Sequence, residues 1–151
     1  PPHRHKPVIH RRQRQMCIRD RYGEGQHKTG QYAPVMSIFK RQKDNKEPLT
    51  VIEPGYQTRD FVHVDDIVHA NILASQKDLS KYGEVFNVGT GEGIDIQTIA
   101  DLISDYQSSI PHRPGEALHS RSNTDKIKET LNWNYKIKVI DWITKKFNGA
   151  S

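Results

Sequence analysis

The chain has 151 residues, of which 34% are hydrophobic, enough for one domain with a lean core. Its formal net charge is +5, but residues 22–151 hold 16 basic and 17 acidic residues, which excludes a broadly basic nucleic-acid-binding body. One cysteine and the lack of a long apolar run exclude an intrachain disulfide and predict no membrane span or signal peptide, so we expect a cytoplasmic protein.

Residues 1–21 are predicted to lie outside the domain, which would then span residues 22–151. They hold seven of the 23 basic residues, one of the 18 acidic residues and no apolar period, a composition typical of disorder. The run 11–20 resembles translated adapter sequence, so we interpret the segment as foreign residues joined to a chain interrupted within a strand. A basic nucleic-acid-binding arm is the alternative. Three histidines there offer a weaker metal hypothesis, because no second ligand cluster accompanies them.

The first half of the domain predicts two helices and two short strands. Residues 31–44 have apolar side chains at helical spacing. Residues 49–52 and 61–64 are short runs rich in β-formers. The second run leads directly into a helix ending near residue 78. Asp65 or Asp66 is its predicted N-cap, because a carboxylate can accept hydrogen bonds from the free amides of a first turn.

The next part predicts a strand at residues 84–88 and a helix capped by Asp95. The apolar stripe of that helix consists of Ile96, Ile99, Ala100, Leu102 and Ile103. Residues 108–122 contain two prolines and a glycine and are expected to be irregular.

The last part predicts two more helices. Asn123 or Thr124 caps the first, which ends near residue 131, and Trp133 is expected to pack after it. The final helix spans residues 139–147, with Ile140, Ile143 and Phe147 on one side. Because strands alternate with helices, the predicted class is α/β.

Several short motifs resemble, in their order, those of one enzyme family. They are Tyr22-Gly23, residues 31–34, residues 48–71 with Arg59-Asp60-Phe61-Val62-His63-Val64-Asp65-Asp66, residues 86–91, Arg113-Pro114-Gly115-Glu116 and Leu131-Asn132-Trp133. The chain from Tyr22 to about Phe147 resembles the NAD-dependent nucleotide-sugar epimerases and dehydratases, the extended short-chain dehydrogenase/reductases. Its pattern is closest to that of the 4-epimerases. The resemblance implies the C-terminal, substrate-binding portion of a Rossmann-type parent, with an incomplete sheet.

The family's catalytic parts are missing from this sequence. No tyrosine has a lysine four residues on, and Gly89-Thr90-Gly91 lacks the third glycine of a dinucleotide fingerprint, whose place Ile94 takes. We therefore expect the catalytic residues and most of the NAD site upstream, and we assign neither a catalytic nor a metal-binding residue here. For the parent, the resemblance implies reversible hydride removal from the sugar by NAD, and a homodimer.

By resemblance, this portion binds a UDP-sugar. Guanidinium groups can bind two oxygens of a diphosphate at once. The resemblance assigns the diphosphate to Arg59 and Arg113, the sugar and nucleotide to Gln31 and Tyr32, and the base to Thr50 and Ile52. Alternatives stay open for three of these: a salt bridge of Arg59 with Asp60 or another local acid, a solvated loop charge at Arg113, and a core position for Ile52.

Ser120 is the predicted specificity residue. The spacing from Arg113 to residues 131–133 equals that of the 4-epimerases, which places Ser120 where the family gates the space beside the sugar C2 substituent. A small serine would leave room for an acetamido group. The alternative is a polar loop residue, with His119 or Arg121 closing the gap.

Some residues depart from the family pattern or carry no expected function. Only Tyr22-Gly23 matches the family's Asn-Val-Tyr-Gly, Glu53-Pro54-Gly55 replaces Gly-Asp-Gly, and Asn123 replaces an aspartate. His63 and His69 are interpreted as surface residues of a strand and a helix, because no acid or cysteine completes a metal site.

Three functional hypotheses follow from the sequence. The first is a fragment of an NAD-dependent nucleotide-sugar epimerase, with a 4,6-dehydratase or reductase of the same family as the enzymatic alternative. The second is a non-catalytic nucleotide-sugar-binding module. The third, a nucleic-acid binder, rests on the basic segment 1–21 alone.

Overall fold

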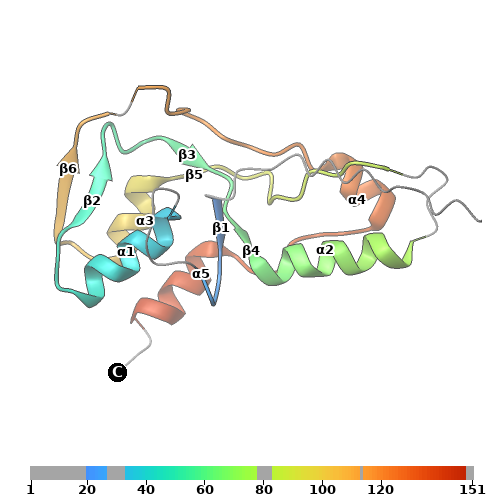
Figure 1. Cartoon of the computed structure of the whole chain (residues 1–151), viewed down its shortest axis with the longest axis horizontal. Coiled ribbons are helices and arrows are strands. Elements are labelled where there is room, and N and C mark those ends of the chain that lie inside the picture. The colour runs from blue at the N-terminus through green and yellow to red at the C-terminus, as the bar shows by residue number, and fades with distance from the viewer. Residues whose placement is uncertain (1–19, 27–32, 78–82, 113, 149–151) are drawn as a thin grey trace, which may run out of the picture.

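The computed structural model describes residues 20–26, 33–77, 83–112 and 114–148, and its alternating strands and helices confirm the α/β class (Figure 1). The strands are β1 (Arg21–Tyr22), β2 (Leu49–Ile52), β3 (Thr58–Arg59), β4 (Val62–His63), β5 (Ile94–Asp95) and β6 (Gln107–Ile110). The helices are α1 (Val35–Asp44), α2 (Val64–Gln76), α3 (Ile96–Ile103), α4 (Asp125–Leu131) and α5 (Val139–Ile143), followed by a π-helical turn at Thr144–Asn148.

The described strands form three two-stranded sheets instead of one continuous sheet. β1 pairs in parallel with β4, β2 pairs in parallel with β6, and β3 is antiparallel to β5. Figure 1 shows α1, α3, α5 and the β2–β6 pair gathered at one end, with α2 and α4 side by side at the other. The separate pairs agree with the predicted incomplete sheet.

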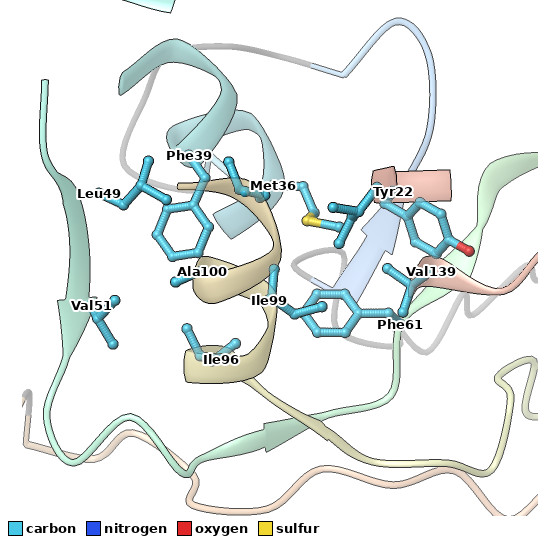
Figure 2. Close-up of a cluster of buried hydrophobic side chains, with 12 residues drawn as sticks. Tyr22, Met36, Phe39, Leu49, Val51, Phe61, Ile96, Ile99, Ala100 and Val139 are labelled. Atoms are coloured by element: carbon cyan, nitrogen blue, oxygen red, sulfur yellow. The ribbon is translucent and has the colours of Figure 1, made fainter. Parts of the chain in front are cut away.

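The larger hydrophobic cluster lies among α1, α3, α5 and β2 (Figure 2). Asp95 caps α3 as predicted, because its carboxylate accepts a hydrogen bond from Thr98 N at 2.6 Å. The buried stripe of α3 faces Phe39 of α1 and Leu49 of β2. Tyr22 is fully buried in the same cluster and donates to the Ile137 carbonyl at 2.8 Å. This burial raises the pKa of Tyr22 above its ordinary value.

The smaller cluster lies between α2 and α4. Its buried members are Ala70, Ile127, Leu131 and Trp133. Trp133 packs there as predicted, and its Nε1 donates to the Asp66 carbonyl at 3.0 Å. The Asp66 carboxylate accepts hydrogen bonds from the amides of Lys136 at 3.0 Å and Ile137 at 3.1 Å. Asp66 therefore ties α2 to the segment that follows α4.

Two predicted strand assignments are wrong. Residues 84–88 form no strand, since they run without β-pairing and Val85 is exposed. Residues 108–110 are not irregular but belong to β6, where Ser108 pairs with Thr50 and Ile110 with Ile52. Apolar composition favoured the first segment and not the second. The presence of a partner strand decides the outcome instead.

The predicted cap of α2 is also wrong. The N-cap is His63, whose Nδ1 accepts a hydrogen bond from Asp65 N at 3.2 Å. His63 is consequently buried and not on the surface, with its ring 5.0 Å from that of Tyr22. Asp65 and Asp66 lie in the first turn, where their negative charges favour the helix N-terminus.

Other helix ends differ by smaller amounts. α1 begins at Val35, after Pro34, and not at residue 31. The cap of α4 is confirmed in place, since Thr124 precedes the helix and Asn123 Oδ1 accepts from Asp125 N at 3.0 Å. In the last helix Ile143 is buried and Ile140 is exposed, so these two residues, predicted on one side, differ in burial.

Candidate functional site

Arg59 lies on the short strand β3, which is held from both sides. On one side β3 pairs with β5, with Arg59 opposite Ile94. On the other side Thr58 N donates to the Leu118 carbonyl at 2.8 Å, and Ser120 N donates to the Thr58 carbonyl at 3.1 Å. These backbone bonds bring Ser120 alongside Arg59 from a distant part of the chain.

The Arg59 guanidinium is paired with two carboxylates. Nη2 donates to Glu116 Oε1 at 3.0 Å, and Nη1 donates to the Thr58 carbonyl at 2.9 Å. Nε lies 3.9 Å from Asp20 Oδ1, and Asp20 Oδ2 accepts a hydrogen bond from Ser120 Oγ at 3.4 Å. We call Arg59, Glu116, Asp20 and Ser120 the Arg59 cluster. The Arg59 side chain is 14% exposed, so the guanidinium is largely shielded from water.

Asp60, the residue that follows β3, is bonded to other parts of the chain. Its buried carboxylate accepts hydrogen bonds from Thr90 N at 2.7 Å, Thr90 Oγ1 at 2.5 Å, Gly91 N at 3.1 Å and Ser122 N at 3.0 Å. A Cβ atom at Gly89 would lie 2.5 Å from Asp60 Oδ2, so glycine is required for this approach. Asp60 thereby fixes the loops that flank the Arg59 strand, and it does not pair with Arg59.

The structure brings two of the predicted site residues, Arg59 and Ser120, into one cluster. Thr50 and Ile52 lie on β2, in a different sheet. Thr50 Oγ1 accepts a hydrogen bond from Gln42 Nε2 of α1 at 2.9 Å, and Ile52 is half-buried. The remaining three predicted residues, Gln31, Tyr32 and Arg113, lie outside the described residues.

Three functional candidates were not found from the sequence. Glu116 lies in the Arg113-Pro114-Gly115-Glu116 motif, and its membership of that motif was the available signal. For Asp60, the available signal was its position next to Arg59 in the sequence. Asp20 carried none, because it falls in the segment predicted to be foreign to the domain.

A polar hollow of about 470 Å³ lies beside the start of α4. It is lined by Thr90, Gly91, Glu92, Arg121, Ser122, Asn123, Thr124, Asp125 and Lys128. Two acids and two bases balance its charge, and Tyr135 donates to Glu92 Oε1 at 2.8 Å, a bond that raises the pKa of Tyr135. No member of the Arg59 cluster lines this hollow. The candidate site is the Arg59 cluster, where backbone pairing brings two predicted site residues together.

Two other kinds of site find no support in the described ranges. No three His, Cys, Asp or Glu side chains gather there as metal ligands. None of the helices in the same ranges has the length and apolar character that crossing a membrane requires.

Residues 17–89, which include Arg59 and Asp60, match the family model of the NAD dependent epimerase/dehydratase family. The chain is related to this family. The match confirms the resemblance inferred from the motifs, and it agrees with the α/β fold of the structure.

Relatives of known name lie within the same family. A provisionally named UDP-glucose 4-epimerase of Methanocaldococcus jannaschii is 31% identical over 84% of this chain and 42% of its own length. The dTDP-L-rhamnose 4-epimerase of Burkholderia thailandensis is 28% identical over 74% of this chain and 32% of its own length. The crystal structure of UDP-glucose 4-epimerase from Thermotoga maritima, with UDP-glucose, is 32% identical with a TM-score of 0.75, over 85% of this chain and 42% of that one. The chain therefore spans less than half the length of these relatives.

The Gly89–Gly91 loop does not fit the dinucleotide phosphates that the family's cofactor would bring. In a phosphate-binding loop, the backbone amides point at the ligand. Here the amides of Thr90 and Gly91 donate to the Asp60 carboxylate, which occupies the position of an anion. This agrees with the missing third glycine of a dinucleotide fingerprint, and we assign no NAD contact to the loop.

Proposed function

We propose that this chain supplies the nucleotide-sugar-binding part of an NAD-dependent nucleotide-sugar epimerase similar to UDP-glucose 4-epimerase. The observation that carries the proposal is Arg59, held on a doubly paired strand beside Ser120 in a chain related to the epimerase/dehydratase family. The similar Thermotoga maritima structure is described with UDP-glucose, which favours a uridine diphosphate sugar as the ligand.

The proposed roles follow from the chemistry of the ligand. Arg59 presents a guanidinium at a partly shielded site, where it can bind diphosphate oxygens more strongly than in water. Arg113 is proposed as the second diphosphate ligand, Gln31 and Tyr32 as contacts to the sugar and nucleotide, and Thr50 and Ile52 as the border of the base. Backbone pairing orients the strand before the ligand arrives, which reduces the entropy lost on binding.

For the longer protein we propose NAD as the cofactor, because the matching family is described as NAD dependent. A homodimer in the cytoplasm, without nucleic-acid or membrane partners, completes the proposal. A proton-transfer role is assigned to no residue of this chain, since no tyrosine has a lysine four residues on.

The binding role is tested by calorimetric titration of this chain with UDP. Arg59→Ala is expected to weaken UDP binding at least tenfold, because it removes charge-assisted hydrogen bonds of about 1.5–3 kcal/mol. Arg121→Ala removes an equal charge from the hollow beside α4 and is the matched control. Loss of binding in Arg121→Ala alone would move the site to the hollow and contradict the proposal.

A non-catalytic nucleotide-sugar-binding module is the second candidate function, favoured by the lack of a Tyr-x-x-x-Lys pair. We expect this chain by itself to bind no NAD and to turn over no UDP-glucose. NAD retained through purification, or any epimerised product, would contradict that expectation. A glycine-rich dinucleotide loop and a Tyr-x-x-x-Lys pair encoded upstream of Tyr22 in genomic DNA would favour the epimerase, and their absence the module.

Substrate preference is proposed to depend on Ser120. We expect the longer protein to accept UDP-N-acetylglucosamine as well as UDP-glucose, because serine leaves space that a tyrosine would fill. Ser120→Tyr should lower kcat/KM for the acetamido sugar selectively, by about 10- to 100-fold, the range a pocket wall provides. Parallel assays with both sugars measure the ratio of their kcat/KM values. An equal loss of kcat/KM for both sugars would contradict the assignment.

A further inference from the structure

The two carboxylates beside Arg59 have different relations to it. Glu116 Oε1 lies 3.0 Å from Nη2 and accepts a hydrogen bond, so it orients the guanidinium. Asp20 Oδ1 lies 3.9 Å from Nε, within ion-pair distance but beyond a normal hydrogen bond. Glu116 therefore anchors the arginine, whereas Asp20 contributes mainly its negative charge.

The charge of Asp20 acts at a shielded place. Asp20 is 6% exposed, and its Oδ2 accepts a hydrogen bond from Ser120 Oγ at 3.4 Å. Water and salt screen a shielded carboxylate less than one on the surface. An anion that approached Arg59 would enter a space where two carboxylates already outnumber the single guanidinium.

We propose that Asp20 is an internal competitor for Arg59, which weakens the binding of a diphosphate at the Arg59 cluster. The inference rests on the proposed binding function and adds a residue that opposes it. The carboxylate occupies the Nε side of the guanidinium and repels phosphate oxygens there. Substitution by asparagine keeps the shape and the acceptor for Ser120 Oγ but removes the charge.

Titration of this chain and of Asp20→Asn with UDP, inorganic pyrophosphate and uridine tests the proposal. Asp20→Asn should bind UDP and pyrophosphate about tenfold more tightly, as expected when a like charge several ångströms from a bound anion is removed at a partly screened site. Uridine carries no phosphate, so its affinity should not change. The gain should disappear in the double variant Asp20→Asn/Arg59→Ala and shrink as the salt concentration rises.

Two control variants keep the test decisive. Asp105→Asn removes the same charge from the exposed turn between α3 and β6 and should leave all three affinities unchanged. Asp20→Ser, with a thermal melt for each protein, replaces the asparagine variant if that one does not fold.

The outcomes separate the two proposals. Unchanged UDP affinity in a folded Asp20 variant, with binding still dependent on Arg59, would overturn the inference and leave the binding function standing. An equal gain for uridine would also overturn it, because a reshaped site and not a charge would then be responsible. If neither this chain nor the Asp20 variants bind UDP, both proposals fall.

Discussion

The two ends of the molecule differ in how completely their helices are covered. Around α1, α3 and α5, twelve buried residues form one cluster, whereas α2 and α4 share a cluster of four. α2 keeps Val64, Val68 and Ile72 exposed at four-residue spacing, with exposed fractions of 37%, 50% and 47%. The stripe of α3 meets partners that the described part of the chain supplies, and this stripe of α2 does not. An apolar pattern thus forms a helix at both ends but a large core at only one.

The largest expected loss of stability comes from Trp133→Ala in the smaller cluster, between α2 and α4. Trp133 is fully buried in the smaller cluster, and loss of a buried aromatic side chain costs about 3–5 kcal/mol. A cluster of four buried residues leaves little to replace it. In hydrogen exchange, α2 and α4 should lose protection while α3 retains it.

Phe39→Ala is the matched substitution in the larger cluster. It should lower the protection of α1 and α3 and leave α2 largely unchanged. A single sharp cooperative loss over all helices in both variants would show that the two ends unfold together, which would contradict the comparison.

Alkaline pH should lower the stability of the larger cluster, because Tyr22 is buried in it. Burial raises the pKa of Tyr22 above the value of about 10 that it has in an unfolded chain. Above pH about 10 the unfolded chain releases a proton that the folded chain keeps, so stability falls as pH rises, by up to about 1.4 kcal/mol per pH unit. Urea unfolding at a series of pH values measures this slope.

Tyr22→Phe should reduce the alkaline slope, whereas Tyr106→Phe, at an exposed position, should keep it. Tyr22→Phe also removes the hydrogen bond to the Ile137 carbonyl and should lower stability at neutral pH by about 1 kcal/mol. An alkaline slope that is identical in the two variants would mean that Tyr22 does not titrate differently on folding.

The smallest effect is expected on the exposed stripe of α2. Val68→Ser should change the free energy of unfolding by less than about 0.5 kcal/mol, because the side chain is half-exposed. Ile127→Ser, at a buried position facing the same helix from α4, should cost several times more. A large, concentration-dependent loss in Val68→Ser would instead reveal that the stripe is covered in solution, and the two ends would be more alike than described here.

Local sequence signals correctly predicted those elements whose stabilising residues are close together in the sequence. Asp95 and its apolar stripe are contained in α3 and its cap, and that helix was predicted correctly. β6 was missed because its polar Gln107–Ile110 sequence forms a strand only through β2, more than 50 residues earlier. The cap of α2 was misplaced because the ring of His63, buried against Tyr22, accepts a hydrogen bond from the Asp65 amide and so begins the helix before the two aspartates.

The candidate site also contains a part that the local sequence predicted and a part that it did not. The motif around Arg59 selected the arginine, and backbone pairing brings it beside Ser120. The acids that hold Arg59 come from positions 20 and 116, and a pattern along one segment contains no information on such contacts. Diphosphate binding by Arg59 stays a prediction, as do the assignments of the other site residues.

The adjacent pair Arg59-Asp60 also has a consequence for how the strand can be placed during folding. Successive side chains of an extended chain point to opposite faces, so a slip of this segment by one residue would bring one of the two charges into the place of the other. A slip in one direction would turn the guanidinium toward the donors of Thr90, Gly91 and Ser122, and a slip in the other would turn the Asp60 carboxylate toward Glu116. Donor would meet donor and anion would meet anion. The order of these two charges thus marks a single permitted alignment of the strand, and any exchange of positions 59 and 60 would favour a misaligned chain.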